Sequence, residues 1–253
     1  MIKTQSLAQI QEKEILYWRE AEHESPESNS PINIFVKMKQ SLDFYHCIHK
    51  YKEIFLNKKQ KRVLELGGGQ GWASALLKSI NKQDEMTLTD ISNYAIESRY
   101  KWEHIWNVKI DHAYPCKSYE IPAHDNSFDL IFCFSAAHHF VAHRRTFNEL
   151  NRVLSPNGHA IYLFEPTSNM FFYKLAYSRV NNQKHTTNHE DLLIPKKIKK
   201  VAFECGFETT VDYYPSIQNR GPIATLYYYT LNKLPNLQKV LPCTVNFIFK
   251  KIN

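Results

Sequence analysis

Four of the seven glycines in this chain of 253 residues lie within five positions, in the stretch Gly67–Gly71. The apolar run RVLEL precedes them, and the helix-forming residues WASALLK follow. Glycine allows a sharp turn and lets a ligand lie directly against the backbone. A strand-to-helix turn by itself needs only one or two glycines. The spacing therefore predicts a ligand-binding loop at the junction between a strand and a helix.

Two carboxylates flank this loop. Glu65 stands two residues before the first glycine, and Asp90 ends the next apolar run, MTLTD. Carboxylates suit a ligand that carries an ammonium group and a ribose diol, whereas they repel a multiply charged phosphate. In dinucleotide folds, an acid about 20 residues beyond the glycine loop also binds ribose hydroxyls. The position of Asp90 therefore fits a nucleoside, but by itself it does not distinguish that nucleoside from NAD.

The glycine spacing differs from two common phosphate-binding patterns. The dinucleotide pattern GxGxxG needs a glycine three residues after the second one, and Trp72 occupies that position after Gly69. The GK[ST] tripeptide of phosphate loops does not occur in the chain. These departures disfavour an NAD(P)-dependent oxidoreductase. That alternative stays open, and calorimetric titration with each cofactor would distinguish the two functions.

Apolar runs and amphipathic patterns alternate on both sides of the loop. The sequence predicts strands at residues 62–66, 86–90, 106–111, 128–135 and 159–165, and helices at 72–78, 92–102 and 144–154. Such alternation is typical of a parallel sheet with right-handed crossovers. Ligands of these sheets bind outside the carboxyl ends of the strands, which is where the glycine loop and Asp90 are expected.

Further elements are predicted before and after this core. An amphipathic helix covers Leu7–Glu20, and a second helix places apolar residues roughly on one face, namely Phe35, Met38, Leu42, Tyr45, Ile48 and Phe55. After the core, a basic helix over Pro195–Cys205 ends at Gly206, a helix covers 223–234, and strands cover 207–213 and 244–249. We therefore expect an α/β fold with seven strands.

Four segments occur in an order that resembles a known family. They are ELGGGQG, LTDIS, IPAHDNSFDLIFCFSAAHHF and ELNRVLSPNGHAIYLFEP, spread over about Lys61–Pro166. They are similar to the successive motifs of class I S-adenosylmethionine-dependent methyltransferases, in the small-molecule branch like that of ubiquinone and menaquinone biosynthesis. The chain departs from the family at Glu65, where Asp is more frequent, and in DHAYPCKSYEIP, which is longer than the usual link.

The resemblance implies a fold and a division of the chain. The fold would be a Rossmann-like, mostly parallel seven-stranded sheet with helices on both faces. Residues 1–57 would form an N-terminal helical lid segment, and residues 58–253 the methyltransferase domain, with a cap insertion at about 167–242. Tyr17 and Trp18 are candidate lid residues, because flat amphipathic rings can cover a cofactor.

The resemblance also implies a binding site for S-adenosylmethionine. Its residues would be Glu65, Gly67, Gly69, Gly71, Asp90, Asp111 and Ser135. The glycines would let the backbone approach the methionine part, Glu65 would neutralise its amino group, and Asp90 would accept from both ribose hydroxyls. Asp111, at the end of the predicted third strand, would accept from the adenine amino group. Ser135, after the fourth strand, would line the floor where cofactor and acceptor meet.

Methyl transfer from a sulfonium needs the acceptor atom, the methyl and the sulfur in line, and water excluded. A hydroxyl or amine acceptor also needs a base for its proton. His138 and His139 follow the fourth predicted strand and are the candidate catalytic residues, because imidazole takes up protons near neutral pH. The alternative is that these two histidines only pack or cap the chain at this place.

Other reactive side chains do not point to a second site. His185 and His189 have HxxxH spacing in a polar stretch without a helical frame, so no metal site is predicted. The five cysteines lack CxxC spacing, so neither a disulfide framework nor a zinc site is expected. Cys116 and Cys243 each follow a proline, but neither follows the fourth strand, where a cysteine nucleophile would stand.

The net charge of +7 permits contact with nucleic acid or a membrane surface, and a solvated basic face explains it equally well. The cations form local clusters at Lys58–Arg62 and Lys196–Lys200. An RNA-directed methyltransferase is one alternative function. Amino-directed nucleic-acid enzymes, however, carry an Asn/Asp-Pro-Pro-aromatic motif that grips the flipped base, where this chain reads FSAAHHF. A catalytically silent partner protein that keeps the fold is the other alternative.

The sequence therefore predicts methyl transfer to an oxygen or nitrogen atom of a lipid-linked, glycan or secondary-metabolite acceptor. Aromatic residues of the cap segment would either wall the acceptor site or pack the cap on the sheet; they are Phe171, Phe172, Tyr173, Tyr177 and Tyr227–Tyr229. The first residues are too polar for a signal peptide, and no apolar run approaches the roughly 20 residues that cross a bilayer. We expect a cytoplasmic monomer or weak homo-oligomer, with no membrane span and no nucleic-acid partner.

Overall fold

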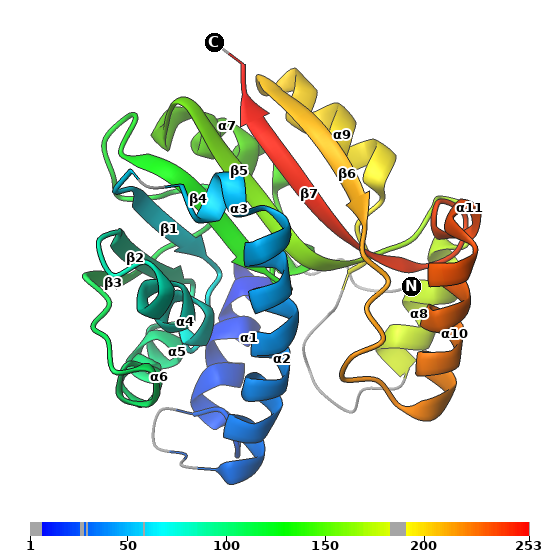
Figure 1. The fold of residues 1–253 in the computed structure, drawn as a ribbon, viewed down its shortest axis with the longest axis horizontal. Helices are drawn as coiled ribbons and strands as arrows, with labels where there is room; N and C mark the ends of the chain where they lie inside the picture. Colours follow the sequence, from blue (N-terminus) through cyan, green and yellow to red (C-terminus); the bar gives the residue numbers. More distant parts are fainter. Residues whose placement is uncertain (1–6, 26–27, 29, 58, 183–190, 253) are drawn as a thin grey trace.

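The computed structural model describes residues 7–25, 28, 30–57, 59–182 and 191–252. Its centre is a seven-stranded sheet in the order β3-β2-β1-β4-β5-β7-β6 (Figure 1). The strands are β1 (Arg62–Leu66), β2 (Glu85–Asp90), β3 (His112–Pro115), β4 (Phe128–Phe134), β5 (Leu154–Thr167), β6 (Phe207–Tyr213) and β7 (Cys243–Lys251). Strands β1 to β5 pair in parallel, and β7 is antiparallel to β5 and β6. The predicted Rossmann-like, mostly parallel sheet is confirmed.

The strand order reverses beside β1. The chain moves from β1 outward to β2 and β3, then returns to place β4 on the other side of β1. Such a reversal opens a crevice at the carboxyl ends of the two central strands. β1 is suited to this position because Val63, Leu64 and Leu66 are buried, as expected for a strand covered on both faces.

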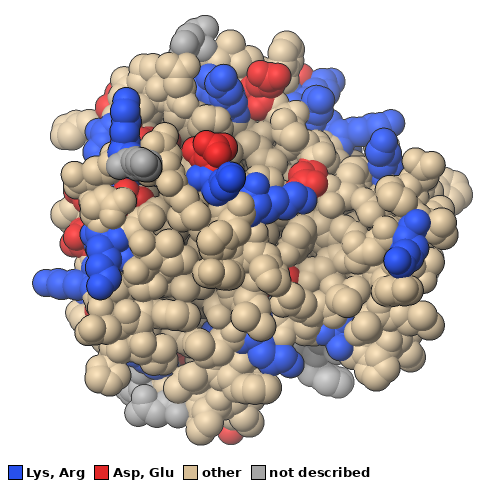
Figure 2. Space-filling view, viewed as in Figure 1, with Lys and Arg blue, Asp and Glu red and all other residues tan. Residues whose placement is uncertain are grey.

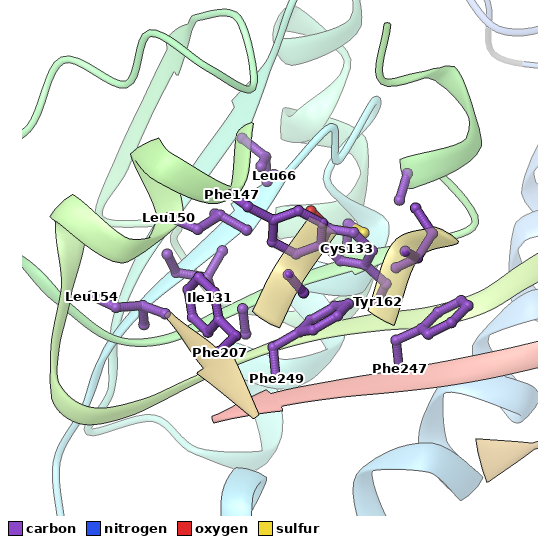
Figure 3. Packing of buried hydrophobic residues seen from close by; sticks show 14 of the residues in the cluster. Leu66, Ile131, Cys133, Phe147, Leu150, Leu154, Tyr162, Phe207, Phe247 and Phe249 are labelled. Carbon is purple, nitrogen blue, oxygen red and sulfur yellow. The ribbon is translucent and has the colours of Figure 1, made fainter. Parts of the chain in front are cut away.

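Helices cover both faces of the sheet (Figure 1). They are α1 (Leu7–Glu20), α2 (Pro31–Lys50), α3 (Lys52–Phe55), α4 (Trp72–Ile80), α5 (Asn93–Glu97), α6 (Arg99–Trp106), the 3₁₀ turn η1 (Ala137–His139), α7 (His143–Val153), α8 (Tyr173–Asn182), α9 (Pro195–Glu204), α10 (Pro222–Lys233) and α11 (Pro235–Gln238). Helices α7 and α9 contribute to one buried cluster, and α2, α4 and α6 to the other. In Figure 3, Phe147 and Leu150 of α7 lie with Tyr162, Phe207 and Phe249 of the sheet.

The third strand differs from the prediction of residues 106–111. Helix α6 continues to Trp106 and ends at Asn107, whose φ of 49° is left-handed. Asparagine tolerates this conformation better than most residues. The turn then folds back, because Glu103 accepts from the amides of Val108 and Ile110 at 3.0 and 2.8 Å. Strand pairing therefore begins only at His112.

Helix α2 is confirmed, but of the predicted apolar stripe only Ile48, in α2, and Phe55, in α3, are buried. Phe35, Leu42 and Tyr45 are exposed, whereas Phe44 and Ile48 are buried. Phe44 stacks on Phe132 and packs edge-on against Phe55 and Phe134, so it sets the buried side of the helix. Polar Ser41 and Asp43 share that buried side. The spacing of apolar residues therefore predicted a different face of the helix as the buried one.

The sequence predicted no membrane-spanning segment and no disulfide framework. Across the described ranges, none of the helices combines the length and the apolar character that a bilayer crossing requires. All five cysteines are described, and none of them forms a disulfide.

Candidate functional site

The glycine loop joins β1 to α4 in a left-handed backbone path. Gly67, Gly69 and Gly71 have φ values of +67°, +54° and +74°, a region that side chains with a Cβ rarely adopt. The amide of Gly68 donates to the carbonyl of Thr89 over 2.9 Å. The loop therefore needs its glycines for conformation, and it is held against the end of β2.

Two aromatic side chains border this loop. A Cβ added at Gly67 would lie 3.2 Å from both Ala136 and the ring of Phe140, in the segment after β4. A Cβ added at Gly69 would lie 2.9 Å from the indole of Trp18, on α1. The loop is therefore enclosed between the N-terminal helix and the segment that follows β4.

Asp90 lies at the carboxyl end of β2, directly beside the loop. Its Oδ2 accepts from the amide of Gly69 and its Oδ1 from the amide of Ser92, each over 2.9 Å. Burial raises the pKa of Asp90 to about 6, against the opposing effect of these backbone hydrogen bonds. Each carboxylate oxygen can accept more than one hydrogen bond. Asp90 therefore retains acceptor capacity for ribose hydroxyls.

Glu65 lies beneath the loop and is 2% exposed. Its Oε2 accepts from the amide and the hydroxyl of Ser74, in the first turn of α4. Burial raises the pKa of Glu65 to about 8, the hydrogen bonds from Ser74 oppose that rise, and the charge of Asp90 adds to it. Glu65 therefore links β1 to α4 from below the glycines, in addition to any effect on a cationic ligand.

Asp111 lies at the wrong edge of the sheet for adenine. Its Oδ2 accepts from Lys78 Nζ at 2.6 Å and from the amide of Met86 at 2.7 Å. Met86 stands near the start of β2, whereas Asp90 ends it. The expectation that Asp111 binds adenine is therefore wrong, because the third strand starts after this residue and not before it.

A cysteine, and not an acid, follows β3 at the carboxyl edge. The amide of Cys116 donates to the carbonyl of Asp90 over 2.8 Å. Burial raises the pKa of the Cys116 thiol to about 12. A neutral thiol therefore lies beside Asp90, at the end of the third strand, where an acid was predicted to accept from the adenine amino group.

The segment after β4 is organised by Glu165, which the sequence did not reveal as a site residue. Glu165 Oε1 accepts from the amides of Ala136 and Ala137 at 2.9 Å. Glu165 Oε2 accepts from the His138 amide at 3.1 Å and contacts His138 Nδ1 at 2.9 Å. The sequence signal that could have indicated Glu165 is an acid near the end of an apolar strand, in YLFEP. Ser135, whose φ is 50°, begins this same segment, and its contact with the cofactor stays a prediction.

The charge state of Glu165 follows from these contacts. Burial alone would raise its pKa, but the hydrogen bond and charge of His138 and the amides of Ala137 and Ala136 together lower it below the ordinary value. Glu165 therefore stays ionised and fixes the backbone that lies against the glycine loop.

The two candidate catalytic histidines lie together but in different surroundings. Their ring centroids are 4.2 Å apart. His138 is buried and paired with Glu165, whereas His139 is partly exposed and its Nδ1 lies 4.0 Å from Glu14 Oε2 of α1. His138 is therefore held as part of the framework, and His139 is the better placed of the two to reach an acceptor.

The N-terminal helices are attached to the loop through Gln70. Its Nε2 donates to the carbonyl of Glu24 over 2.8 Å, and its Oε1 accepts from Asn33 over 3.1 Å and from Trp102 Nε1 over 3.3 Å. Tyr17 in turn donates to Glu24 over 2.7 Å. The residues around Tyr17 and Trp18 are therefore connected to the loop by both packing and hydrogen bonds.

The aromatic residues of the predicted cap have separate environments. Tyr173 and Tyr177 stack with centroids 5.7 Å apart, and Tyr173 donates to Asp191 over 2.5 Å. Tyr228 lies against the Arg220 guanidinium, 3.3 Å from its ring centroid, whereas Phe171 is 85% exposed. These residues do not form one continuous packing layer. The HxxxH pair, residues 185 and 189, falls outside the described residues.

The sheet order, the glycine loop and Asp90 define a nucleoside-binding α/β protein. Residues 64–162 match a family model described as Methyltransferase domain. The demethylmenaquinone methyltransferase of Staphylococcus haemolyticus is 28% identical over 137 residues, which are 52% of this chain and 56% of that protein. The chain spans about half the length of the curated relatives it matches.

Solved structures share the fold. The geranyl diphosphate C-methyltransferase of Streptomyces coelicolor A3(2) aligns with a TM-score of 0.66 at 11% identity, over 96% of this chain and 98% of that one. Phosphoethanolamine N-methyltransferase 2 of Haemonchus contortus aligns with a TM-score of 0.54 at 16% identity, over 80% of this chain and 51% of that one. Residues 64–162 therefore resemble a methyltransferase domain, and the chain shares its fold with solved methyltransferases.

Proposed function

We propose that this protein binds S-adenosylmethionine at the glycine loop and transfers its methyl group to an oxygen or nitrogen atom of a small molecule. The observation that carries the proposal is the contact between the Gly69 amide and Asp90 at the switch point of the sheet. This contact places the glycine backbone beside a carboxylate that can accept further hydrogen bonds. Ribose hydroxyls can donate those bonds. Asp90, whose pKa is about 6, is ionised at neutral pH, and its negative charge favours a cationic ligand over a phosphate.

The residues present fit this cofactor. Asp90 holds the ribose, the backbone of the glycine loop borders the methionine part, and the indole of Trp18 keeps water out. When bound, the cofactor supplies an activated methyl group. The chain positions the acceptor and removes its proton, and His139 is the residue that we assign to that proton.

The acceptor site lies beyond the carboxyl ends of β4 and β5. Residues 1–57 serve as its lid, and the helices of the segment 167–242 serve as its cap. The curated relatives are named for demethylmenaquinone, and aromatic residues are frequent in the cap. These points support an apolar acceptor of the lipid-linked or secondary-metabolite type over a glycan, and they support a protein that works in the cytoplasm on a small molecule.

Calorimetry followed by methyl transfer tests the proposal. The protein is titrated with S-adenosylmethionine and, separately, with NAD, and heat is expected with the first alone. It is then incubated with cofactor carrying a labelled methyl group and with pools of demethylated quinones, small-molecule metabolites or RNA. Label in a small molecule supports the proposal, and NMR of the product identifies the methylated atom. Label in RNA alone, or cofactor binding without any transfer, contradicts it.

A further inference from the structure

Helices α8, α10 and α11, with the turn before α8, expose large apolar side chains. These residues, here called the apolar surface, are Met170, Phe171, Leu175, Ile223, Leu226, Tyr229, Leu234 and Val240. Phe171 and Ile223 are the most exposed of them, at 85% and 82%. Single exposed apolar residues are ordinary, but a group of them marks an interaction site.

The two segments that carry the apolar surface lie next to each other. Asn169 Nδ2, just before α8, donates to the carbonyl of Val240, just after α11, over 2.6 Å. Figure 1 places α8, α10 and α11 together at one end of the molecule. The exposed side chains therefore belong to one region of the protein although they are far apart in sequence.

The two stretches of sequence that carry the apolar surface contain charges of one sign. The chain contains 25 acids, yet none occurs between Pro166 and His189 or between Tyr213 and Asn253. Cations are present in the same stretches, and they include Lys174, Arg179, Lys233 and Lys239. In Figure 2, the area over α10 and α11 shows blue atoms and no red ones. A partner of negative charge would therefore meet cations without meeting carboxylates of these helices.

We infer that the apolar surface docks on an anionic lipid bilayer. Apolar side chains insert shallowly below the headgroups, while lysine and arginine beside them reach the lipid phosphates through flexible stems. Each basic residue near an anionic membrane adds to binding, and carboxylates would subtract from it. The combination of exposed apolar residues with acid-free flanks fits such a bilayer.

The apolar surface is also connected to the carboxyl edge of the sheet. Helix α8 follows the end of β5, and β7 begins after α11, with Thr167 of β5 paired to Cys243 of β7. If the proposed function holds, an acceptor dissolved in the bilayer would approach the site from this side. Docking itself does not rest on the proposed function, because it needs neither cofactor nor acceptor.

Vesicle sedimentation without cofactor or acceptor tests the inference. The protein is mixed with vesicles of phosphatidylcholine alone or of phosphatidylcholine with phosphatidylglycerol. We expect binding to the anionic vesicles, weakened by salt. The double variant Ile223→Ser, Leu226→Ser should reduce binding at least about tenfold, because two inserted side chains are lost. Circular dichroism establishes that the variant is folded.

Two matched controls use helix α9, which carries its own exposed apolar residue and lysines. Phe203 is 69% exposed and Leu226 is 68% exposed, so Phe203→Ser removes a similar surface and should leave vesicle binding unchanged. The charge reversals Lys233→Glu and Lys239→Glu should weaken binding more than Lys196→Glu and Lys197→Glu do. Equal effects of the two pairs would overturn the inference.

Other outcomes would also overturn it. One is the absence of sedimentation with either vesicle, and another is equal binding to both vesicles. A third is a dimer in analytical ultracentrifugation that the double variant converts to a monomer, since the apolar surface would then be a contact between two copies. None of these results bears on methyl transfer, which is measured separately with a soluble acceptor.

Discussion

The backbone amide of Gly69 donates to Asp90 Oδ2 over 2.9 Å, so the glycine loop and the acid at the end of β2 form one structural unit. The carboxylate that would bind a ribose also fixes the backbone against which the rest of the ligand would lie. A change at Asp90 therefore affects both the contact and the shape of the loop.

Asp90→Asn should weaken the binding of S-adenosylmethionine by at least about tenfold. The variant loses the charge that strengthens hydrogen bonds from ribose hydroxyls, and such bonds contribute roughly 1.5–3 kcal/mol. Calorimetric titration measures the change. Asp111→Asn is the matched control: this acid lies at the opposite edge of the sheet, so its loss should leave the affinity as it is. Equal losses in the two variants would refute the corrected placement of Asp111.

Glu65 should make the protein less stable as the pH rises. Its pKa of about 8 in the fold exceeds the ordinary glutamate value, so between about pH 4.5 and 8 the folded state holds a proton that the unfolded chain has released. The stabilisation is complete below the unfolded pKa and is lost as the pH passes the folded pKa. The slope is at most about 1.4 kcal/mol per pH unit.

Denaturant unfolding at several pH values measures this slope, and Glu65→Gln should flatten it. Asp90, with a pKa of about 6, contributes in the same direction over a lower range. The Asp90→Asn variant separates the two contributions. A parent protein whose stability rises steadily from pH 5 to 8 would rule out a buried, protonated Glu65.

Glu165→Gln should destabilise the fold by about 3 kcal/mol. The carboxylate accepts from three backbone amides and meets His138 Nδ1, and an amide would turn one acceptor into a donor inside a buried network. Urea unfolding checks the loss. Glu120→Gln, at an exposed acid paired with Lys117, should leave the unfolding midpoint unchanged, since exposed ion pairs contribute little.

Gly69→Ala and Trp18→Ala should be coupled. Alanine at Gly69 takes a strained positive φ and places its Cβ 2.9 Å from the indole, so it should cost about 1–3 kcal/mol of stability. In the Trp18→Ala background only the backbone strain remains, and the cost should fall. Gly221→Ala, where nothing lies within 4 Å, should change stability by less than about 0.5 kcal/mol. An additive double variant would show that α1 does not rest on the loop.

His139→Ala should lower kcat roughly 10²–10⁴-fold for an oxygen or nitrogen acceptor, while cofactor affinity stays constant. His138→Ala should instead lower stability, because it leaves Glu165 without its imidazole partner. Steady-state kinetics and thermal unfolding distinguish the two effects. Undiminished turnover in His139→Ala would remove this residue as the base.

The sheet and the ligand loop were predictable because their signals are local. RVLEL is apolar except at Arg62 and Glu65, and a glycine cluster suits the left-handed backbone path after it. Strand β3 lies at the sheet edge and is only partly buried. Its apolar pattern is therefore weak, and the strand was predicted in the preceding stretch, which ends at Asp111. The role of Glu165 depends on a loop 27 to 29 residues away, and no local pattern reports such a contact.

The side chain of Gln70 has a consequence for how a ligand enters. One amide group joins the glycine loop to the turn after α1, to α2 and to α6. Separation of the N-terminal helices from the loop would break two of these bonds, the one to Glu24 and the one from Asn33. Ligand entry should therefore involve an open and a closed state of the N-terminal helices. The lifetime of the closed state would set how long a nucleoside stays bound.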